Sequence, residues 1–368
     1  MVNTNSIIYQ VFVRNYSKEG TFKALEKDLQ RIKDLGVDVI YLCPIHEIGE
    51  LKRKGTCGSP YAVKDYYSIT RDYGTKEDFL SLINSIHSLD MKIIIDMVFN
   101  HTSPDSVLLK EHPEYYFYRE GKNANKVGDW SDIIDLETSL EATQDYLVNV
   151  LKYWRGLGVD GFRFDVASMV NISVFKKARD VLPKDTFFLA ESISTGFYNY
   201  LKESGVYVSS DEELSPYFDY EYNYNWYHDL EDYLIGKKSI DDLVNNINID
   251  VVTRTNSLEN HDRERIASLS KDRGSLLSLL SFSFFLKGSA FIYMGEEYGV
   301  KHKPELFEKD PVDWVKDEEM YKFIQSLIKK KKERGNVISQ TLIKTSDYSI
   351  KVSLVNDKGN KYEEEFKF

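Results

Sequence analysis

The segment VDGFRFD, residues 159–165, decides the fold of this chain. Side chains alternate between the two faces of a β-strand, so Gly161, Arg163 and Asp165 share one face. Phe162 and Phe164 share the other face, where we expect them to pack under helices. The Arg–Asp pair would then face an enclosed polar space. This division is typical of a buried strand in a parallel sheet or barrel that helices cover.

Apolar strands alternate with amphipathic helices on both sides of this segment. Strands are expected at residues 7–13, 37–42, 93–95, 159–164, 186–190, 217–222, 251–257 and 290–294. Helices are expected at residues 21–35, 76–89, 174–182 and 318–332, with another restarting near Leu147. Eight β–α units with right-handed crossovers predict an α/β fold, a (β/α)8 TIM barrel. An open doubly wound sheet competes, but no glycine-rich phosphate fingerprint follows the first strand.

Two segments break this rhythm. Residues 102–140 are polar and loop-like, which predicts a short insertion after the third strand. Near the end of the chain Ile350, Val352 and Leu354 alternate with polar residues, and residues 356–359 carry a turn signal. This pattern predicts a small C-terminal antiparallel β appendage. We therefore divide the chain into a catalytic barrel of residues 1–101 and 141–334, an insertion of residues 102–140, and a truncated C-terminal β domain of residues 335–368.

The composition of the 368 residues is that of an ordinary globular protein, with 42% hydrophobic and 29% charged residues. The chain has 48 Lys and Arg against 59 Asp and Glu, a formal net charge of −11. Because phosphate binding needs clustered cations, this balance disfavours nucleic acid and anionic membranes as partners. Two cysteines, Cys43 and Cys57, exclude a disulfide scaffold and a four-cysteine zinc site. We expect two buried thiols, and a single bridge stays open if the chain is exported.

No targeting or membrane segment is apparent. The longest apolar stretch, residues 276–293, contains Ser278, Ser281, Ser283, Lys287 and Gly288. This pattern favours a buried helix followed by a buried strand over a membrane span. The expected location is therefore cytoplasmic, unless a leader has been removed.

Polar side chains end four of the expected strands. They are Asp96, Asn100 and His101 after the third strand, Asp165 after the fourth, Glu191 after the fifth, and Asn260, His261 and Asp262 after the seventh. Any one of them alone has an ordinary structural explanation as a cap, a turn or a buried histidine. Their occurrence in order favours a shared site, because the carboxyl ends of barrel strands meet at one face.

Two of these carboxyls are expected to differ in protonation. Arg163 beside Asp165 would lower the pKa of that carboxyl and keep it ionised, as a nucleophile requires. Glu191 follows an apolar run, where desolvation would raise its pKa, as an acid requires. One ionised and one protonated carboxyl is the pairing that glycoside hydrolysis uses. A metal-dependent hydrolase built on Asp96 and His101 is disfavoured, because no paired histidine motif is present.

Together these segments resemble the ordered signature of the α-amylase superfamily, glycoside hydrolase family 13. The matching segments are DMVFNH at 96–101, GFRFD at 161–165, AE at 190–191 and NHD at 260–262. Supporting matches are residues 36–44, the pair Asp135-Leu136, GEEYG at 295–299, and the loop 58–65 that contains Tyr61. The resemblance implies a barrel enzyme that cleaves α-glucosidic bonds of maltooligosaccharides or α-glucans by double displacement.

The resemblance also implies roles for the matching residues. Asp165 would be the nucleophile, Glu191 the acid and later the base, and Asp262 would stabilise the transition state. The reaction would be retaining, with the two working carboxyls about 5–5.5 Å apart. The implied substrate-binding set comprises Tyr61, which stacks on a sugar, Asp96, which supports Arg163, Asn100, the sugar-binding His101 and His261, and Arg163, which orients the nucleophile.

Three positions depart from common patterns of the family. Ser168 and Met169 stand where calcium-dependent members often have Lys-His, so we expect no metal and no other cofactor. Val166, after the nucleophile, resembles members that cut α-1,6 bonds. Gly58 stands where pocket-type α-glucosidases often have Asp, which favours a more open cleft. An α-1,6-acting oligosaccharide glucosidase and a glucanotransferase on the same scaffold stay open, whereas a non-catalytic barrel is disfavoured because all three carboxylates are present.

Overall fold

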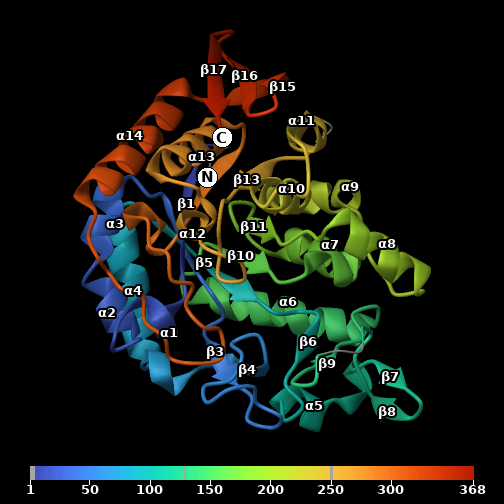
Figure 1. Cartoon of the computed structure of the whole chain (residues 1–368). Helices are drawn as coiled ribbons and strands as arrows, with labels where there is room; N and C mark the ends of the chain where they lie inside the picture. The colour runs from blue at the N-terminus through green and yellow to red at the C-terminus, as the bar shows by residue number, and fades with distance from the viewer. Residues whose placement is uncertain (1–4, 128–129, 249–251) are drawn as a thin grey trace.

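The computed structural model describes residues 5–127, 130–248 and 252–368, and within them eight parallel strands form a closed barrel (Figure 1). The strands are β1 (Ile7–Val11), β2 (Val39–Leu42), β5 (Lys92–Met97), β10 (Gly161–Phe164), β11 (Phe187–Ala190), β12 (Tyr220–Tyr222), β13 (Arg254–Asn256) and β14 (Ser289–Tyr293). Each pairs with the next along the chain, and β14 closes the ring on β1 with Ala290 opposite Ile7. The predicted (β/α)8 barrel is therefore confirmed.

The helices follow the barrel strands in order. They are α1 (Val13–Tyr16), α2 (Phe22–Glu26) and α3 (Leu29–Leu35) after β1, α4 (Lys76–Ser88) after β2, α6 (Glu141–Gly156) after β5, α7 (Ile172–Val181) after β10, α8 (Thr195–Glu203) and α9 (Asp211–Leu214) after β11, α10 (Tyr224–Leu234) and α11 (Ile240–Asn248) after β12, α12 (Ile266–Leu269) and α13 (Arg273–Phe285) after β13, and α14 (Glu318–Arg334) after β14. The apolar stretch 276–293 is a buried helix and strand, as expected. Within the described ranges, no helix has both the length and the apolar character that spanning a bilayer requires.

Several expected boundaries were wrong. The helix expected at residues 21–35 is two helices, because the backbone leaves the helical region at Asp28 (φ −104°, ψ 0°) and its carboxylate binds Arg31. The first strand ends at Val11, since α1 begins two residues later. The strand expected at 93–95 extends through Asp96, which therefore lies inside β5. The seventh strand is shorter than expected, and Val251 lies outside the described residues.

The inner faces of the barrel strands change character along their length. Nine buried side chains form an apolar barrel layer, made of Ile8, Val39, Tyr41, Ile94, Phe187, Leu189, Tyr220, Tyr222 and Phe291. Gly161 makes room for this layer, because a Cβ on it would lie 2.2 Å from the Phe187 carbonyl oxygen. The next inward positions on β5 and β10 are the buried Asp96 and Arg163.

The outer face of β10 packs under helices as predicted. The Phe164 ring contacts Phe175 of α7 with ring centroids 5.1 Å apart, and Phe188 of β11 at 4.9 Å. Phe162 is equally buried and contacts Phe188 at 6.3 Å. The alternation seen in VDGFRFD is therefore the division between the helical layer and the barrel interior.

Two excursions extend the lower end of the barrel in Figure 1. Between β5 and α6 lie β6 (His101–Thr102), α5 (Val107–Glu111), β7 (Tyr118–Arg119), β8 (Lys122–Asn123) and β9 (Ile134–Asp135), with β6 and β9 antiparallel. The antiparallel pair β3 (His46–Ile48) and β4 (Val63–Ile69) follows β2 and was not predicted, because its solvent-facing side is polar. Both excursions directly follow barrel strands, so the carboxyl ends of the strands face this end.

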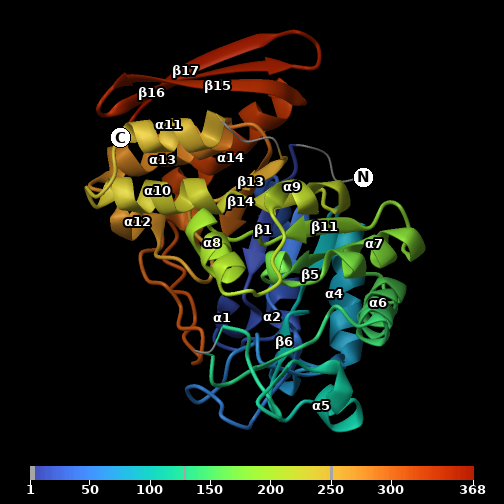
Figure 2. The ribbon, with the colours of Figure 1, turned by 90° about the vertical axis from the view of Figure 1, so that its right-hand side faces the viewer.

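The opposite end carries an antiparallel sheet of β15 (Val337–Ser346), β16 (Ser349–Asn356) and β17 (Lys361–Lys367), which confirms the predicted C-terminal strands. The sheet lies over α11, α13 and α14 (Figure 2). Phe366 of β17 packs on Phe282 and Phe285 of α13 with ring centroids 5.3 and 5.4 Å apart. Buried apolar rings therefore attach the sheet to the barrel.

Both cysteines are free. Cys43 is buried beside the barrel mouth, but Cys57 is only partly buried, contrary to the expectation of two buried thiols.

Candidate active site

One fully buried guanidinium holds three carboxylates at the carboxyl ends of β5, β10 and β11. Arg163 Nη1 lies 2.8 Å from Asp96 Oδ1 and 3.0 Å from Asp165 Oδ1. Arg163 Nη2 lies 2.8 Å from Glu191 Oε2. We call these four residues the charged mouth of the barrel. Three of the predicted strand ends therefore converge as the sequence indicated, with Arg163 as the common partner.

Asp165 is nearly buried, with 7% of the residue exposed. Burial raises its pKa well above the usual range, the charge of Glu191 raises it further, and Arg163 works in the opposite direction. Arg163 does lower the pKa of Asp165, as the sequence suggested, but burial raises that pKa by more in the free site. Because the Glu191 pKa is also raised, first by burial, the two carboxyls bind a proton more readily than isolated ones do.

Glu191 is held by a backbone group as well as by Arg163. Its Oε2 accepts a hydrogen bond of 2.7 Å from the N–H of Val166, the residue after Asp165. Val166 has φ +36° and ψ 49°, a left-handed conformation. Arg163 and this N–H both lower the pKa of Glu191 and so oppose the larger effect of burial. Sequence reasoning did not predict this contact.

Asp262 and His261 lie on the loop that follows β13. His261 Nε2 is 3.0 Å from Asp262 Oδ2, and the Asp262 side chain is 39% exposed. Partial desolvation works against ionisation of Asp262, but His261, Arg163 and Lys303 outweigh it and lower its pKa to about 2. The Asn260 side chain accepts a hydrogen bond of 2.9 Å from the Asp262 N–H and so fixes the loop. Asp262 is therefore an ionised carboxylate at neutral pH.

Tyr61 joins this loop to the charged mouth. Its ring stacks on His261 with centroids 5.2 Å apart and 14° between the planes. Its hydroxyl lies 2.6 Å from His261 Nε2 and donates a hydrogen bond of 3.0 Å to Asp96 Oδ2. The structure thus brings together Tyr61, His261 and Asp96, three residues that the sequence resemblance assigned to substrate binding.

Two further side chains were missed by sequence reasoning. Gln10 of β1 lies with Nε2 2.8 Å from His261 Nδ1, and Tyr41 of β2 donates a hydrogen bond of 2.6 Å to Asp96 Oδ2. Each is the inward residue two positions after an apolar one, Ile8 or Val39. A polar group at the carboxyl end of a strand's inner face is the signal that would have found them.

His101 lies at the start of the insertion and is nearly buried. Burial lowers its pKa to about 4, so the ring is neutral at physiological pH. Asn100 is fully buried, with Nδ2 3.2 Å from His101 Nδ1 and 3.4 Å from Asp135 Oδ1. Asp96 is fully buried as well. Asn100 therefore contacts His101, and Asp96 contacts Arg163, the support that the resemblance implied for Asp96.

Lys126 lies beside Asp135 in the insertion. The backbone N–H of Lys126 donates to Asp135 Oδ2 at 2.7 Å, and its ammonium donates to the Leu136 carbonyl at 2.8 Å. Burial lowers the pKa of Lys126 and raises that of Asp135 to about 6. Among the described residues, no group of three or more His, Cys, Asp or Glu side chains could hold a metal ion. The Lys126 ammonium places positive charge near Asp135.

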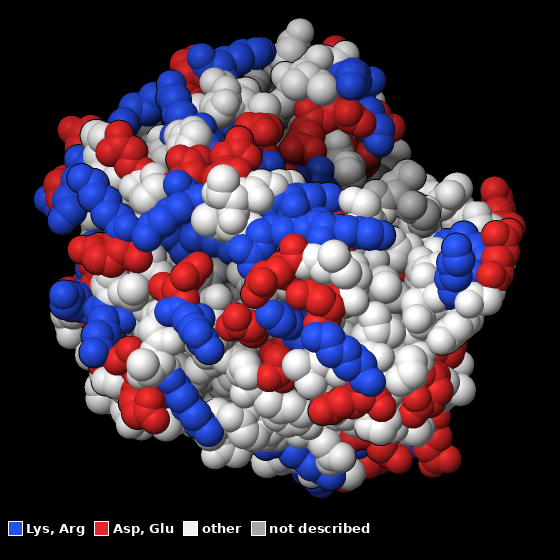
Figure 3. Space-filling model, turned by 90° about the horizontal axis from the view of Figure 1, so that it is seen from below, with Lys and Arg blue, Asp and Glu red and all other residues white. Residues whose placement is uncertain are grey.

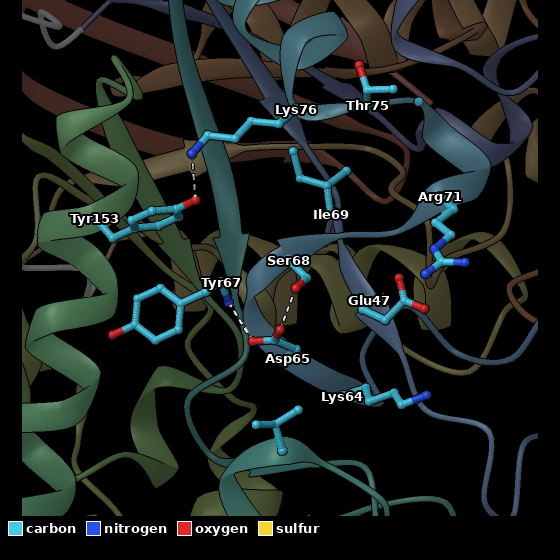
Figure 4. Close-up of a pocket in the computed structure, with 12 residues that line it drawn as sticks. Glu47, Lys64, Asp65, Tyr67, Ser68, Ile69, Arg71, Thr75, Lys76 and Tyr153 are labelled. Atoms are coloured by element: carbon cyan, nitrogen blue, oxygen red, sulfur yellow. Dashed lines mark hydrogen bonds between the residues drawn. The ribbon is translucent and has the colours of Figure 1, made fainter.

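A pocket of about 620 Å³ is lined by residues of the β3–β4 pair and of α4 and α6 (Figure 4). Tyr67 and Asp65 of β4 face it, together with Lys76 of α4 and Tyr153 of α6, whose hydroxyl accepts a hydrogen bond of 3.0 Å from Lys76. None of the residues that line it belongs to the predicted site. Tyr66, between Asp65 and Tyr67, points the other way and is buried.

The lower face of the molecule carries both signs of charge. A band of Lys and Arg crosses its middle, with Asp and Glu on both sides (Figure 3). This interspersed pattern differs from the uniform field that steers a strongly charged ligand.

A closed (β/α)8 barrel with paired carboxyls, a third ionised carboxylate and an aromatic ring at the carboxyl ends of its strands is the arrangement of a barrel glycosidase. The chain belongs to the α-amylase family, whose model "Alpha amylase, catalytic domain" matches residues 6–192 and 211–345. The matched residues include the charged mouth and Asp262.

Individual relatives agree with this assignment. The structure superimposes on an α-amylase from Lactobacillus plantarum with a TM-score of 0.89, 37% identity, and 95% of this chain and 88% of that chain covered. A maltogenic α-amylase from Thermotoga neapolitana gives a TM-score of 0.88 and 30% identity, with 100% and 86% covered. A probable oligo-1,6-glucosidase of Bacillus subtilis is 25% identical over 370 residues, which cover 80% of this chain but only 65% of that protein.

Proposed function

We propose that this chain is a retaining α-glycoside hydrolase that cleaves α-glucosidic bonds in maltooligosaccharides or related α-glucans. The observation that carries the proposal is the charged mouth, in which Asp165 and Glu191 share Arg163 while Asp262 lies ionised beside His261. Membership of the α-amylase family supports the substrate class.

In the first step Asp165 attacks the anomeric carbon while Glu191 gives its proton to the departing glycosidic oxygen. The bond between that carbon and oxygen breaks, and a covalent bond to Asp165 forms. Arg163 and Asp96 hold the nucleophile in place from below. The ionised Asp262 stabilises the positive charge that develops on the sugar. Tyr61 provides a ring face for the sugar, and His101 and His261 bind its hydroxyls.

In the second step a water molecule attacks the same carbon. Glu191, now a carboxylate, takes the proton of the water, and Asp165 leaves with its electron pair. Two inversions give net retention of the α configuration. Buried surroundings raise the Glu191 pKa, and this favours the protonated form that the first step needs.

A second candidate is an enzyme of the same mechanism with α-1,6 preference, or one that transfers the glycosyl group to a sugar hydroxyl instead of water. Val166 after the nucleophile and the resemblance to an oligo-1,6-glucosidase favour the α-1,6 alternative. Transfer would use the same glycosyl-enzyme and differ only in the acceptor.

Three further proposals concern the protein as a whole. The barrel (1–101 and 141–334), the insertion (102–140) and the C-terminal β domain (335–368) are proposed as its structural divisions. Activity is proposed to need no calcium or other cofactor, since the Lys126 ammonium supplies positive charge near Asp135. The proposed location is cytoplasmic, which free Cys43 and Cys57 and a 24% identical intracellular maltogenic amylase of Bacillus subtilis support.

A product profile tests these proposals. The protein is incubated with maltoheptaose, isomaltooligosaccharides, pullulan and soluble starch, and early products are followed by proton NMR of their anomeric signals. We expect α-configured products, and unchanged rates after dialysis against EDTA. Absence of cleavage, or first products of β configuration, would overturn the hydrolase proposal. Products longer than the substrate would favour transfer.

A further inference from the structure

Val166 has a backbone conformation that its own side chain disfavours. Four non-glycine residues among those described have positive φ, and the other three, Lys52, Asp90 and Glu120, have unbranched side chains at Cβ. Val166 has a β-branched side chain, for which a left-handed backbone is a genuine outlier. It directly follows Asp165. Strain of this kind persists where surrounding contacts impose it, and it concentrates at functional positions.

The hydrogen bonds of Val166 and its neighbours converge on Glu191. The Val166 N–H donates to Glu191 Oε2 at 2.7 Å, and Arg163 Nη2 lies 2.8 Å from the same oxygen. Two backbone hydrogen bonds align the same strands: Ala167 N–H donates to the Glu191 carbonyl at 3.0 Å, and Glu191 N–H donates to the Phe164 carbonyl at 3.1 Å. The main chain of Glu191 is therefore fixed separately from its carboxyl.

We propose that the backbone N–H of Val166 is a positioning group that determines which oxygen of Glu191 carries the catalytic proton. Oε2 accepts a hydrogen bond from this N–H and lies 2.8 Å from the positively charged Arg163 Nη2, and the proton lies on Oε1. This inference rests on the proposed function, because it specifies how the acid of that reaction is oriented.

The physical reason is that the two oxygens of a carboxylic acid have different hydrogen-bonding roles. Its protonated oxygen donates through O–H, whereas its other oxygen is the better acceptor. A proton on Oε2 would face the N–H donor of Val166 and would lie beside the positive charge of the Arg163 guanidinium. A proton on Oε1 avoids this conflict. In the first step the Oε1–H bond breaks and the proton moves to the glycosidic oxygen, and in the second step Oε1 takes a proton from water.

Loss of this N–H has a defined effect on pH dependence. The N–H stabilises the ionised form of Glu191, so its removal raises the Glu191 pKa further. The high-pH limb of kcat/KM would then move upward by about one pH unit. Other ionisable or charged groups that interact with Glu191 and stay in place are Arg163, Asp96, Asp165, Asp262, Tyr222 and Tyr224.

The test replaces Val166 with α-hydroxyvaline, which turns the amide into an ester and deletes the N–H while keeping the side chain. Substrates are a series of aryl α-maltotriosides whose phenols range from strongly to weakly acidic. Weakly acidic phenols need the proton of Glu191 in order to leave, and strongly acidic ones do not. We expect kcat/KM to fall about tenfold or more for the weakly acidic phenols and to change little for the strongly acidic ones.

The matched control places lactic acid at Ala167, which deletes the hydrogen bond to the Glu191 carbonyl but leaves its carboxyl untouched. It should keep the wild-type dependence on the phenol. Equal losses across the series, the same losses in the control, or no upward shift of the high-pH limb would overturn the proposal. Wild-type protein that cleaves none of these substrates would instead refute the proposed function.

A genetically encoded variant covers the case in which the ester protein does not fold. Val166→Gly keeps the N–H and adopts the left-handed backbone without strain. The proposal predicts the wild-type ratio of kcat/KM between weakly and strongly acidic phenols. A ratio lowered about tenfold would show that the valine side chain orients Glu191, and would overturn the proposal.

Discussion

The barrel interior has two halves that are built from the same strands and follow opposite rules. In the amino half the inward side chains are apolar, among them Ile8, Val39, Ile94 and Phe187, and Gly161 is present because no larger residue fits. At the carboxyl ends of β5, β10 and β11 the next inward side chains, Asp96, Arg163 and Glu191, are charged and nearly or fully buried. Along β10 the inward positions change from apolar to charged within five residues, from Gly161 through Arg163 to Asp165.

The difference shows how a folded chain tolerates a buried charge cluster. Desolvating one ion costs several kcal/mol unless a partner compensates it, and Arg163 is placed to compensate three carboxylates. The apolar layer closes the barrel beneath the cluster. We therefore expect substitutions in the amino half to change stability, and substitutions of the reacting carboxyls to change activity.

The largest effect is expected for Asp165→Asn. The amide cannot form the glycosyl-enzyme, so kcat should fall by roughly 10³-fold or more. The free energy of unfolding should not decrease, because the substitution removes one of several like charges near Glu191. Initial rates on maltoheptaose and urea unfolding measure the two quantities. The control is Asp180→Asn, at an exposed position on α7. A near-normal rate in Asp165→Asn would show that Asp165 is not the nucleophile.

Arg163→Met tests whether the charged mouth depends on a single cation. Without Arg163 the carboxyls lose their common partner, and the free energy of unfolding should fall by roughly 3–5 kcal/mol at pH 8. At pH 5 the loss should be smaller, because carboxyls whose pKa rises become protonated and neutral. Urea unfolding at both pH values measures this. An equal loss at the two pH values would contradict the compensation argument.

Gly161→Ala tests the amino half. Its Cβ would lie 2.2 Å from the Phe187 carbonyl oxygen, so the strands must shift, at a cost of roughly 1–3 kcal/mol. Gly156→Ala in α6 is the matched control, because its Cβ would meet no atom within 4 Å. That helix position should gain about 0.5–1 kcal/mol. Thermal or urea unfolding measures both variants. If both substitutions changed the free energy of unfolding in the same direction, crowding inside the barrel would not be the cause of the Gly161→Ala effect.

The smallest effect concerns His46 of β3, a buried group outside both halves. Neither ring nitrogen has a hydrogen-bond partner among the described residues, and burial lowers its pKa to about 4. Its folded pKa lies below the unfolded value, so its contribution to stability is present at neutral pH and is lost as pH falls.

His46→Phe should remove that dependence. Between pH 7 and pH 5.5 the wild type should lose about 1 kcal/mol more than the variant. The Phe ring can keep the edge-to-face contact with Trp154. Urea unfolding at the two pH values measures the difference, and parallel losses in the two proteins would refute the assignment.

The sequence predicted most of the barrel because strand periodicity and strand ends are local properties. The pattern of residues 159–165 gave both faces of β10, and the ordered polar ends gave the residues that converge on Arg163. The local pattern could not predict that Gln10 and Tyr41 belong to the site. Their contacts are with His261 and Asp96, which lie in other parts of the chain. Nor could the pattern give the backbone of Val166, which valine does not favour intrinsically.

The protonation of the site also escaped sequence reasoning. Arg163 two residues before Asp165 suggested a lowered pKa, yet burial of the whole cluster raises it. Burial is set by the closure of eight strands and their helices, which no short segment encodes. The β3–β4 pair was missed for a related reason, since its polar outer face faces a pocket and not the core.

The pairing of Ile7 with Ala290 has a consequence for the synthesis of this protein. One edge of β1 stays unpaired until the ribosome has made β14, about 280 residues later. At 5–20 residues per second this takes about 15–55 s. During that time the apolar β1 edge is open to pairing with other nascent chains. We expect the isolated amino-terminal half to aggregate, and the nascent chain to depend on factors that shield exposed strand edges until β14 emerges.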